Sequence, residues 1–303
     1  ELILSQSADV CAVGEVLHMW DRAVANNLLC GCGEPFSSCP FWQKVGEHAF
    51  GGWSNVDAGE VLALKRAVDR TRFIPRLARR SLPEKRHEPL RRYVDYYLRV
   101  YRAATAVTGA QVVVDSSKLP SLAYALSWAP GLDLRVLHLV RDSRGVAYSW
   151  TKKVRRPEVV SGEAYMSTHS PAKMGVLWLA HNIALHWLSD RLPVRRLHYE
   201  DFTHDPVGTI QEVRRFAGLA DTDEALRVLR DPAVTPARMH SISGNPMRFF
   251  TDPIRIRRDE AWRTRMPRLS RALVSAITWP LRLHYGYVLA GRAPREAERK
   301  EAR

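Results

Sequence analysis

The feature of the sequence that most constrains its fold is a series of short apolar runs that alternate with helical patterns. Three such runs are QVVVD (111–115), LRVLHLV (134–140) and VRRLHYE (194–200). The first is continuous and β-branched, which is typical of a strand covered on both faces in a parallel sheet. Segments with apolar residues at helical spacing follow each run. This order predicts an α/β fold of three layers, in which a parallel sheet lies between helices.

The helical segments share apolar residues spaced three and four positions apart. They are 91–108, 119–129, 142–153, 171–190 and 205–219. The first ends at Gly109, a residue that suits the left-handed conformation after a helix. Ser116 and Ser117 precede the second, and we expect these serines to cap it. The late segment LVSAITWPLRLHYGYVLAG is interrupted by a proline and charged residues, so a surface amphipathic helix is favoured over a membrane span.

The order of the segments indicates one domain over residues 1–291, followed by a flexible tail at 292–303. Residues 30–89 do not fit the alternation, and we interpret them as an insertion on the acceptor side of the fold. The opening ELILSQSADVCAVGE is expected to form a helix and has no signal-peptide features. The whole chain has four cysteines, which are too few for a disulfide scaffold, and this favours a cytoplasmic protein.

The positive charge of the chain is concentrated in one stretch. The formal net charge is +14, and residues 65–102 contain 13 Lys or Arg against 4 Asp or Glu. Such a stretch suits nucleic acid, an anionic membrane surface or an acidic substrate. A solvated helix face would explain it equally well. A non-catalytic protein that binds nucleic acid or an anionic surface is therefore an alternative function.

Three cysteines are clustered within CGCGEPFSSC, at Cys30, Cys32 and Cys39. Buried thiols are the favoured interpretation, and a zinc site or a disulfide are the alternatives. A zinc site normally has four ligands. The fourth would come from Cys11, His18 or His48.

Polar residues follow each predicted strand at the edge where open α/β sheets bind ligands. Lys118 follows the first run, Arg141 follows the second, and Tyr199 lies with Glu200 and Asp201 at the end of the third. Ser149 lies eight residues after Arg141, two turns into the next helix. A guanidinium and a hydroxyl at this spacing could both contact a phosphate that lies alongside the helix. The sequence therefore predicts an anion site here.

The segment LHLVRDSRGVAYS (137–149) resembles the 3′-phosphate-binding segment of sulfotransferases that use 3′-phosphoadenosine 5′-phosphosulfate. The resemblance implies a P-loop NTPase-like sulfotransferase fold. It also implies that Arg141 and Ser149 bind the 3′-phosphate of this donor, with Lys153 as an additional contact.

Two later segments are similar to the same family in the same order. HYEDFTHDP resembles the Tyr-Glu-Asp segment before a helix, which implies that Tyr199 lies near the adenine. SGNPMRFF resembles a late loop that closes on the 3′-phosphate, which makes Arg248 the implied contact.

Two further segments resemble the carbohydrate and tyrosylprotein branch of the family. DSSKLP lies where proteins of that branch carry a lysine that acts on the transferred sulfuryl group. The resemblance implies this role for Lys118. VCAVGEV matches a Gly-Glu pair that supplies the general base, which implies that Glu15 takes the proton of the acceptor hydroxyl. The family's Ser/Gly/Thr-rich loop for the 5′-phosphosulfate has no match, so we expect an incomplete N-terminus or a degenerate donor site.

These observations together predict a bacterial sulfotransferase that moves a sulfuryl group from the nucleotide donor to a hydroxyl. The acceptor would be a carbohydrate, a glycolipid or a small-molecule alcohol, with peripheral membrane contact as a further expectation. No metal and no nucleic-acid partner are expected. A kinase or ATPase is disfavoured because no G-x-x-x-x-G-K-[ST] loop occurs.

Overall fold

The chain folds into two compact units. The computed structural model describes residues 1–79, 81, 84–159, 164–231, 236–250, 252–253 and 255–288. The first unit comprises Glu1–Arg135, Arg156–Ala164 and Ala217–Ile254, and the second comprises Val136–Arg155, Tyr165–Phe216 and Arg255–Arg303. The single domain over 1–291 stays a prediction, and the predicted tail at 292–303 lies outside the described residues.

The first unit contains one pair of parallel strands, β1 (Val10–Gly14) and β2 (Val112–Asp115). Val10 lies opposite Val112, and the register shifts between Ala12 and Gly14. The helix expected over residues 1–15 is wrong, because only a short 3-10 turn, η1 (Leu4–Gln6), precedes β1. The β-branched residues of β1 favour a strand once β2 is available to pair with it.

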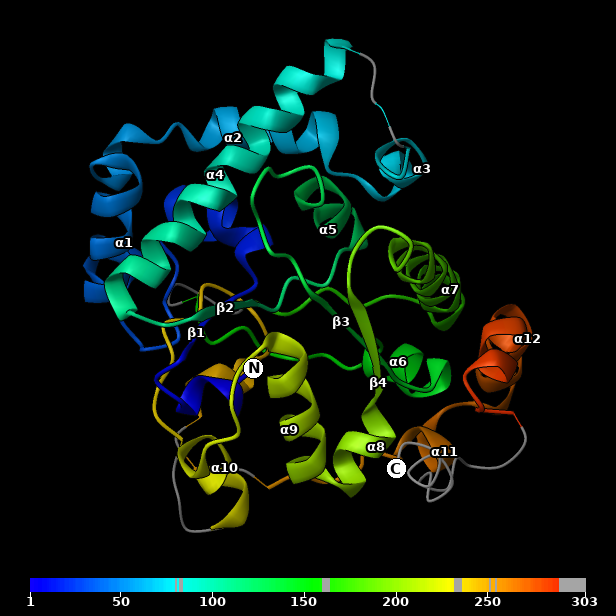
Figure 1. Cartoon of the computed structure of the whole chain (residues 1–303). Helices are drawn as coiled ribbons and strands as arrows, with labels where there is room; N and C mark the ends of the chain where they lie inside the picture. The colour runs from blue at the N-terminus through cyan, green and yellow to red at the C-terminus, as the bar shows by residue number, and fades with distance from the viewer. Residues whose placement is uncertain are drawn as a thin grey trace. The chain divides into compact units, whose positions relative to one another are not determined.

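The first unit combines several helices with a core of large aromatic side chains. The helices are α1 (Pro40–Phe50), α2 (Ala58–Val68), α3 (Ile74–Leu77), α4 (Glu84–Thr108), α5 (Pro120–Leu126) and α10 (Asp223–Arg230). The long α4 packs against α1 and α2 (Figure 1). Trp20, Trp42 and Tyr97 are fully buried, and Tyr93 OH donates to Asp69 Oδ2 at 2.7 Å.

Short turns connect these elements. They are η2 (Val16–His18), η3 (Met19–Val24), η4 (Phe36–Ser38), η5 (Trp53–Asn55), η6 (Thr71–Phe73) and η7 (Pro246–Phe249). The helix expected over 91–108 is confirmed within α4, and Gly109 follows it with φ of 72°. The serine cap of the next helix is wrong, because Leu119 is the N-cap of α5. Ser117 Oγ instead accepts from the Leu17 N–H at 2.9 Å.

The second unit contains β3 (Val136–Val140) and β4 (Val194–His198), which pair in parallel with Val136 opposite Val194. Its helices are α6 (Ser143–Ser149), α7 (Pro171–Leu188), α8 (Tyr199–His204), α9 (Pro206–Ala217), α11 (Trp262–Arg265) and α12 (Arg268–His284). The predicted α/β class is therefore confirmed. The helix expected to reach residue 153 ends at Ser149, so Lys153 lies beyond it.

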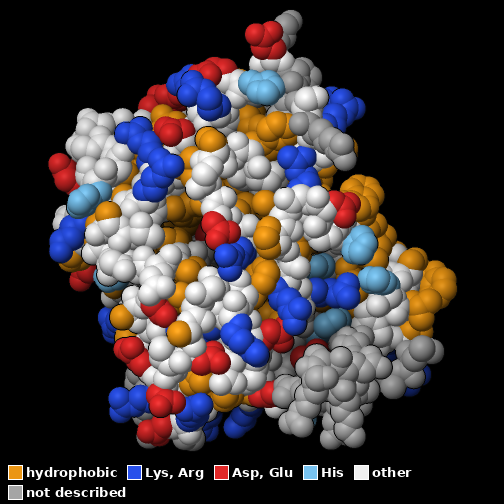
Figure 2. All heavy atoms as spheres, in the orientation of Figure 1, with side chains coloured by type: hydrophobic (Ala, Val, Ile, Leu, Met, Phe, Trp, Pro, Cys, Tyr) orange, Lys and Arg blue, Asp and Glu red, His pale blue; other side chains and the backbone are white. Residues whose placement is uncertain are grey.

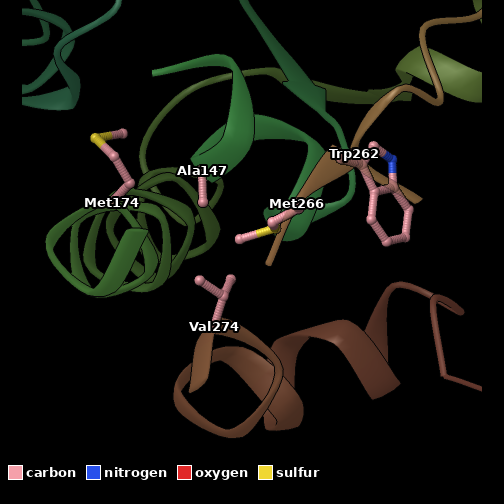
Figure 3. Packing of buried hydrophobic residues seen from close by; sticks show 5 residues of the cluster. All are labelled: Ala147, Met174, Trp262, Met266 and Val274. Carbon is pink, nitrogen blue, oxygen red and sulfur yellow. The ribbon is translucent and has the colours of Figure 1, made fainter. Parts of the chain in front are cut away.

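A hydrophobic cluster in the second unit fixes α6, the helix that follows Arg141. Ala147, Met174, Trp262, Met266 and Val274 converge from α6, α7, α12 and the α11 region (Figure 3). In the same interior, Ser143 and Thr278 share a hydrogen bond of 2.7 Å between their buried hydroxyls. The packing holds the start of α6 against α12.

The basic stretch at residues 65–102 runs through α2, η6, α3 and α4. Lys65 Nζ donates to the Leu17 carbonyl at 2.6 Å, and Arg99 Nε donates to the Ala49 carbonyl at 2.9 Å. On the face seen in Figure 2, Lys and Arg side chains are interspersed with Asp and Glu. Within the part of the chain described, no helix has the length and apolar character needed to cross a membrane.

Candidate functional site

The carboxyl ends of β1 and β2 bring Glu15 and Lys118 together as an ion pair. The side chain of Glu15 is 11% exposed, whereas that of Lys118 is 66% exposed. Parallel strands end at the same edge of a sheet, so the residues that follow them become neighbours although 103 positions separate them in sequence. The pair joins a buried carboxylate to an ammonium group that solvent and a ligand can reach.

The loops that carry this pair are held by hydrogen bonds to Asp115, the last residue of β2. Asp115 Oδ1 accepts from the N–H groups of Ser117 at 2.8 Å and Val16 at 3.3 Å. Tyr101 OH donates to Asp115 Oδ2 at 2.6 Å. Burial raises the pKa of Asp115, and these donors oppose that shift. The carboxylate thus fixes the backbone on both sides of the Glu15 and Lys118 pair.

A second loop, residues 241–244, closes on Glu15 from another part of the first unit. The Glu15 N–H donates to the Ser243 carbonyl at 3.2 Å, and the Ile242 N–H donates to the Val13 carbonyl at 3.0 Å. Gly14 has φ of 81°, and a Cβ atom there would lie 2.7 Å from the Ile242 nitrogen. Only glycine permits both this conformation and this close approach.

The sequence did not place two further polar residues, His18 and Arg22, beside Glu15. His18 Nε2 lies 3.7 Å from Glu15 Oε2, and Arg22 Nη1 donates to Ser243 Oγ at 2.5 Å. Both follow Glu15 in the same turn-rich segment, at offsets of three and seven. This spacing was the available signal, since one face of a helical segment repeats at these intervals.

Arg141 follows β3 in the second unit and contacts Asp259 and Tyr199. Its Nη2 donates to the Asp259 carbonyl at 2.7 Å and lies 3.3 Å from Asp259 Oδ2. The guanidinium carbon lies 4.5 Å from the centroid of the Tyr199 ring. Partial burial raises the pKa of Asp259, but hydrogen bonds from the Ala261 N–H and from Arg141 lower it overall. Arg141 is thus a cation held beside an aromatic ring and paired with a half-exposed carboxylate.

Tyr199 begins α8, directly after β4, rather than ending the strand as the sequence suggested. Its hydroxyl donates to the Arg257 carbonyl at 3.2 Å and accepts from the Asp259 N–H at 3.0 Å. A small pocket beside this ring also has the ring of Trp262 in its wall. The loop at 255–260 therefore belongs to this site, although no pattern in the sequence indicated it.

Ser149 and Lys153 lie at and beyond the far end of α6. Arg141 precedes this helix and Ser149 is its last residue, so the backbones of the two residues lie at opposite ends of α6. Lys153 Nζ lies 4.2 Å from the centroid of the Tyr165 ring. The convergence of Arg141, Ser149 and Lys153 on one phosphate stays a prediction.

Arg248 is buried in the first unit and is bound by the protein itself. Its Nη1 donates to the Ser241 carbonyl at 2.8 Å and its Nη2 to the Leu29 carbonyl at 3.3 Å. Glu158 Oε2 lies 4.0 Å from Nη2, and burial lowers the pKa of the guanidinium. This arrangement holds two loops together, while the phosphate contact of Arg248 stays a prediction.

One group of side chains in the first unit has the composition of a metal site. Cys30, Cys32, Cys39 and His240 place one sulfur or nitrogen atom each within 4.8 Å of one another. The fourth ligand predicted from Cys11, His18 or His48 is wrong. His240 takes this position because the fold brings it to Cys39 from 201 positions away.

Comparison with known protein families gives a match to one family model. The family model for the sulfotransferase domain matches residues 91–265. The chain belongs to the sulfotransferase family. The matched part of this sulfotransferase contains β2, β3, β4 and the segments of Lys118, Arg141, Ser149 and Tyr199.

Two solved structures are similar to this sulfotransferase. The sulfotransferase domain from the curacin biosynthetic pathway is 16% identical, with a TM-score of 0.49 and coverage of 95% of this chain and 93% of that one. The sulfotransferase domain from the Synechococcus PCC 7002 olefin synthase is 17% identical, with a TM-score of 0.43 and coverage of 93% and 94%. No curated protein matches the chain.

Proposed function

We propose that this sulfotransferase transfers a sulfuryl group from 3′-phosphoadenosine 5′-phosphosulfate to the hydroxyl of an acceptor. The observation that carries the proposal is the ion pair of Glu15 and Lys118 at the carboxyl ends of two parallel strands. A carboxylate and an ammonium group placed side by side supply the base and the positive charge that this transfer needs.

In the proposed reaction, the acceptor oxygen attacks the sulfur atom of the donor. A new oxygen–sulfur bond forms, and the bond between the sulfur and the bridging phosphate oxygen breaks. The acceptor proton passes to the Glu15 carboxylate, and adenosine 3′,5′-bisphosphate leaves with the electron pair of the broken bond. Lys118 would stabilise the negative charge on the sulfuryl and bridging oxygens.

The placement of Glu15 supports its role as the base. Its carboxylate is buried, and its backbone is fixed by the Ser243 carbonyl on one side and by Asp115 through Val16 on the other. A positioned base acts efficiently because little reorganisation precedes proton transfer. The higher exposure of Lys118 suits a residue that must reach the charge on the donor.

The second unit supplies groups suited to the nucleotide. Arg141 offers a planar fork of donors for a phosphate, and it already holds an anion, the Asp259 carboxylate. Tyr199 and Trp262 line one small pocket with aromatic rings, which suits a purine base. We assign the 3′-phosphate to Arg141, Ser149 and Lys153 and the adenine to the neighbourhood of Tyr199.

The test is a transfer assay with sulfur-labelled donor and three classes of acceptor: carbohydrates, glycolipids and small alcohols. We expect labelled product with one class and one bisphosphate released for each sulfuryl group transferred. Calorimetry with adenosine 3′,5′-bisphosphate tests the nucleotide site without any acceptor. If the protein bound neither the bisphosphate nor the donor, the proposal would be wrong.

A further inference from the structure

We propose that Cys30, Cys32, Cys39 and His240 bind a structural zinc ion. The three cysteines lie between β1 and α1, whereas His240 precedes the loop that closes on Glu15. Three sulfurs and one imidazole nitrogen form a donor set typical of structural zinc.

Four of the six distances between the donor atoms lie close to the edges of a tetrahedron around one ion, and all six are within 4.8 Å. A zinc–sulfur bond of about 2.3 Å places two sulfur ligands about 3.8 Å apart. Cys39 Sγ lies 3.7 Å from Cys30 Sγ and 3.7 Å from Cys32 Sγ. A sulfur and a nitrogen ligand should lie about 3.6 Å apart, and His240 Nδ1 lies 3.2 Å from Cys39 Sγ and 4.0 Å from Cys30 Sγ.

The surroundings of the four ligands are suited to a closed site. Cys30 is 1% and Cys39 0% exposed, and Cys32 is half-buried. Four protein ligands leave no position for a substrate, which is the arrangement of structural rather than catalytic zinc.

The backbone holds the cysteine loop in the shape that the ligands require. The Cys30 N–H donates to the Glu34 carbonyl at 2.8 Å, and the Gly31 N–H donates to the Ser241 carbonyl at 2.9 Å. A Cβ atom on Gly31 would lie 2.6 Å from the Met239 carbonyl oxygen, so only glycine allows this close approach between the two segments.

His240 is also held in position by contacts outside the cluster. Its ring stacks on Phe41, with 5.1 Å between the ring centroids and 19° between the planes. Trp42 Nε1 donates to the His240 carbonyl at 3.0 Å. These two contacts hold the ring and the backbone of His240 beside Cys39.

The other interpretations of the cysteine cluster explain less of this geometry. All four cysteines of the chain are free thiols, and sulfur atoms 3.7 Å apart are not bonded to each other. Burial of small thiols alone gives no reason for four donor atoms to converge from two distant segments. A single tetrahedral ion accounts for both the distances and the donor types.

The proposed ion would connect the cysteine loop to the segment that carries Ser241, Ser243 and Arg248. Ser243 accepts from the Glu15 N–H, and Arg248 donates to the Ser241 and Leu29 carbonyls. Zinc would therefore stabilise the loop that closes on Glu15 without touching a substrate. Its presence does not depend on which group the enzyme transfers.

The experiment measures metal in the purified protein by mass spectrometry after expression with added zinc. We expect one zinc ion per chain in the wild-type protein and little zinc in the double variant Cys30→Ser, Cys39→Ser and in His240→Asn. Cys11→Ala and His48→Asn are the matched controls, because Cys11 and His48 lie outside the cluster, and both should keep the metal.

A second measurement uses the wild-type protein alone, in case the variants fail to fold. Cobalt(II) exchanged into the site should give thiolate-to-cobalt charge-transfer bands and the visible bands of tetrahedral cobalt. Wild-type protein without zinc and without these bands would overturn the proposal. Full zinc content in the folded double variant would overturn it as well.

Discussion

Lys118 and Glu15 form an ion pair in which the lysine is mostly exposed and the carboxylate is mostly buried. Glu15 directly follows β1, and Lys118 lies three residues after the end of β2. Their proximity is therefore a direct result of the parallel pairing of the two strands. The asymmetry in exposure separates their proposed roles. The buried member is suited to accept a proton, and the exposed member is suited to meet an anionic group.

Replacing Glu15 with Gln should remove the base and preserve the shape of the side chain. We expect turnover in the transfer assay to fall by about a hundredfold or more, which is typical of the loss of a general base. Affinity for adenosine 3′,5′-bisphosphate, measured by calorimetry, should change little. A variant that kept full turnover would show that the base is another residue.

Replacing Lys118 with Ala should lower kcat by about a hundredfold, because the charge that stabilises the transferring group is lost. Lys118→Arg should restore part of the rate, since the charge remains. Lys44→Ala, which changes an exposed lysine of α1, is the matched control and should keep the wild-type rate. Equal rates for Lys118→Ala and Lys44→Ala would contradict the role proposed for Lys118.

Replacing Arg141 with Ala should weaken the binding of adenosine 3′,5′-bisphosphate. A charge-assisted hydrogen bond contributes about 1.5 to 3 kcal/mol, which corresponds to a loss of about 10- to 150-fold in affinity. The matched control is Arg195→Ala, because Arg195 lies on β4 and pairs with Glu212 at the surface. An unchanged dissociation constant for the Arg141 variant would refute the phosphate assignment.

Asp259→Asn should have the opposite effect on the same measurement. The Asp259 carboxylate is paired with Arg141 and lies 3.4 Å from Lys152 Nζ, so it competes with a phosphate for both cations. We expect the variant to bind the bisphosphate several-fold more tightly. Weaker binding would instead indicate that the carboxylate is needed to hold the 255–260 loop in its binding shape.

His138 should make the stability of the protein sensitive to mild acid. This residue of β3 is buried, and its Nε2 lies 2.8 Å from Asn182 Oδ1. Burial, opposed by the hydrogen bond to Asn182 and assisted by Arg196 and His186, lowers the pKa of His138 from 6.5 to about 4. Between these values the unfolded chain binds a proton that the folded chain does not bind, so stability falls as the pH falls.

A pKa difference of this size corresponds to about 3 kcal/mol of unfolding free energy. The measurement is urea unfolding of the wild type and of His138→Gln at pH values between 7 and 4. Glutamine keeps a donor for Asn182 but does not titrate. We expect the variant to lose less stability than the wild type over this range, and parallel curves would contradict the expectation.

Those parts of the fold that depend on local sequence could be predicted. Continuous apolar runs indicated β2 and β3, and helical spacing indicated α7 and α9, because both patterns reflect burial of neighbouring residues. The opening segment was predicted wrongly as a helix. VCAVG becomes β1 through pairing with β2, and a sequence pattern carries no information about a partner so far along the chain.

Some residues of the candidate site could also be predicted from the sequence, and others could not. Arg141, Lys118 and Glu15 could be selected because they follow strands or match a family segment. Asp259 and His240 could not, since their contacts with Arg141 and Cys39 depend on the tertiary fold alone. The serines after β2 were given a local role as a helix cap, whereas Ser117 accepts from the distant Leu17 N–H.

The pairing of β1 with β2 also affects how this chain reaches its native state. The hydrogen bond from the Val16 N–H to Asp115 joins positions 99 residues apart. Closing such a long loop costs conformational entropy before the contacts between the strands can stabilise it, so parallel pairing of this kind slows folding. Until β2 pairs with β1, the backbone edge of the apolar strand β1 is available to other chains. Refolding yield should therefore decline as protein concentration rises, because association competes with a slow intramolecular search.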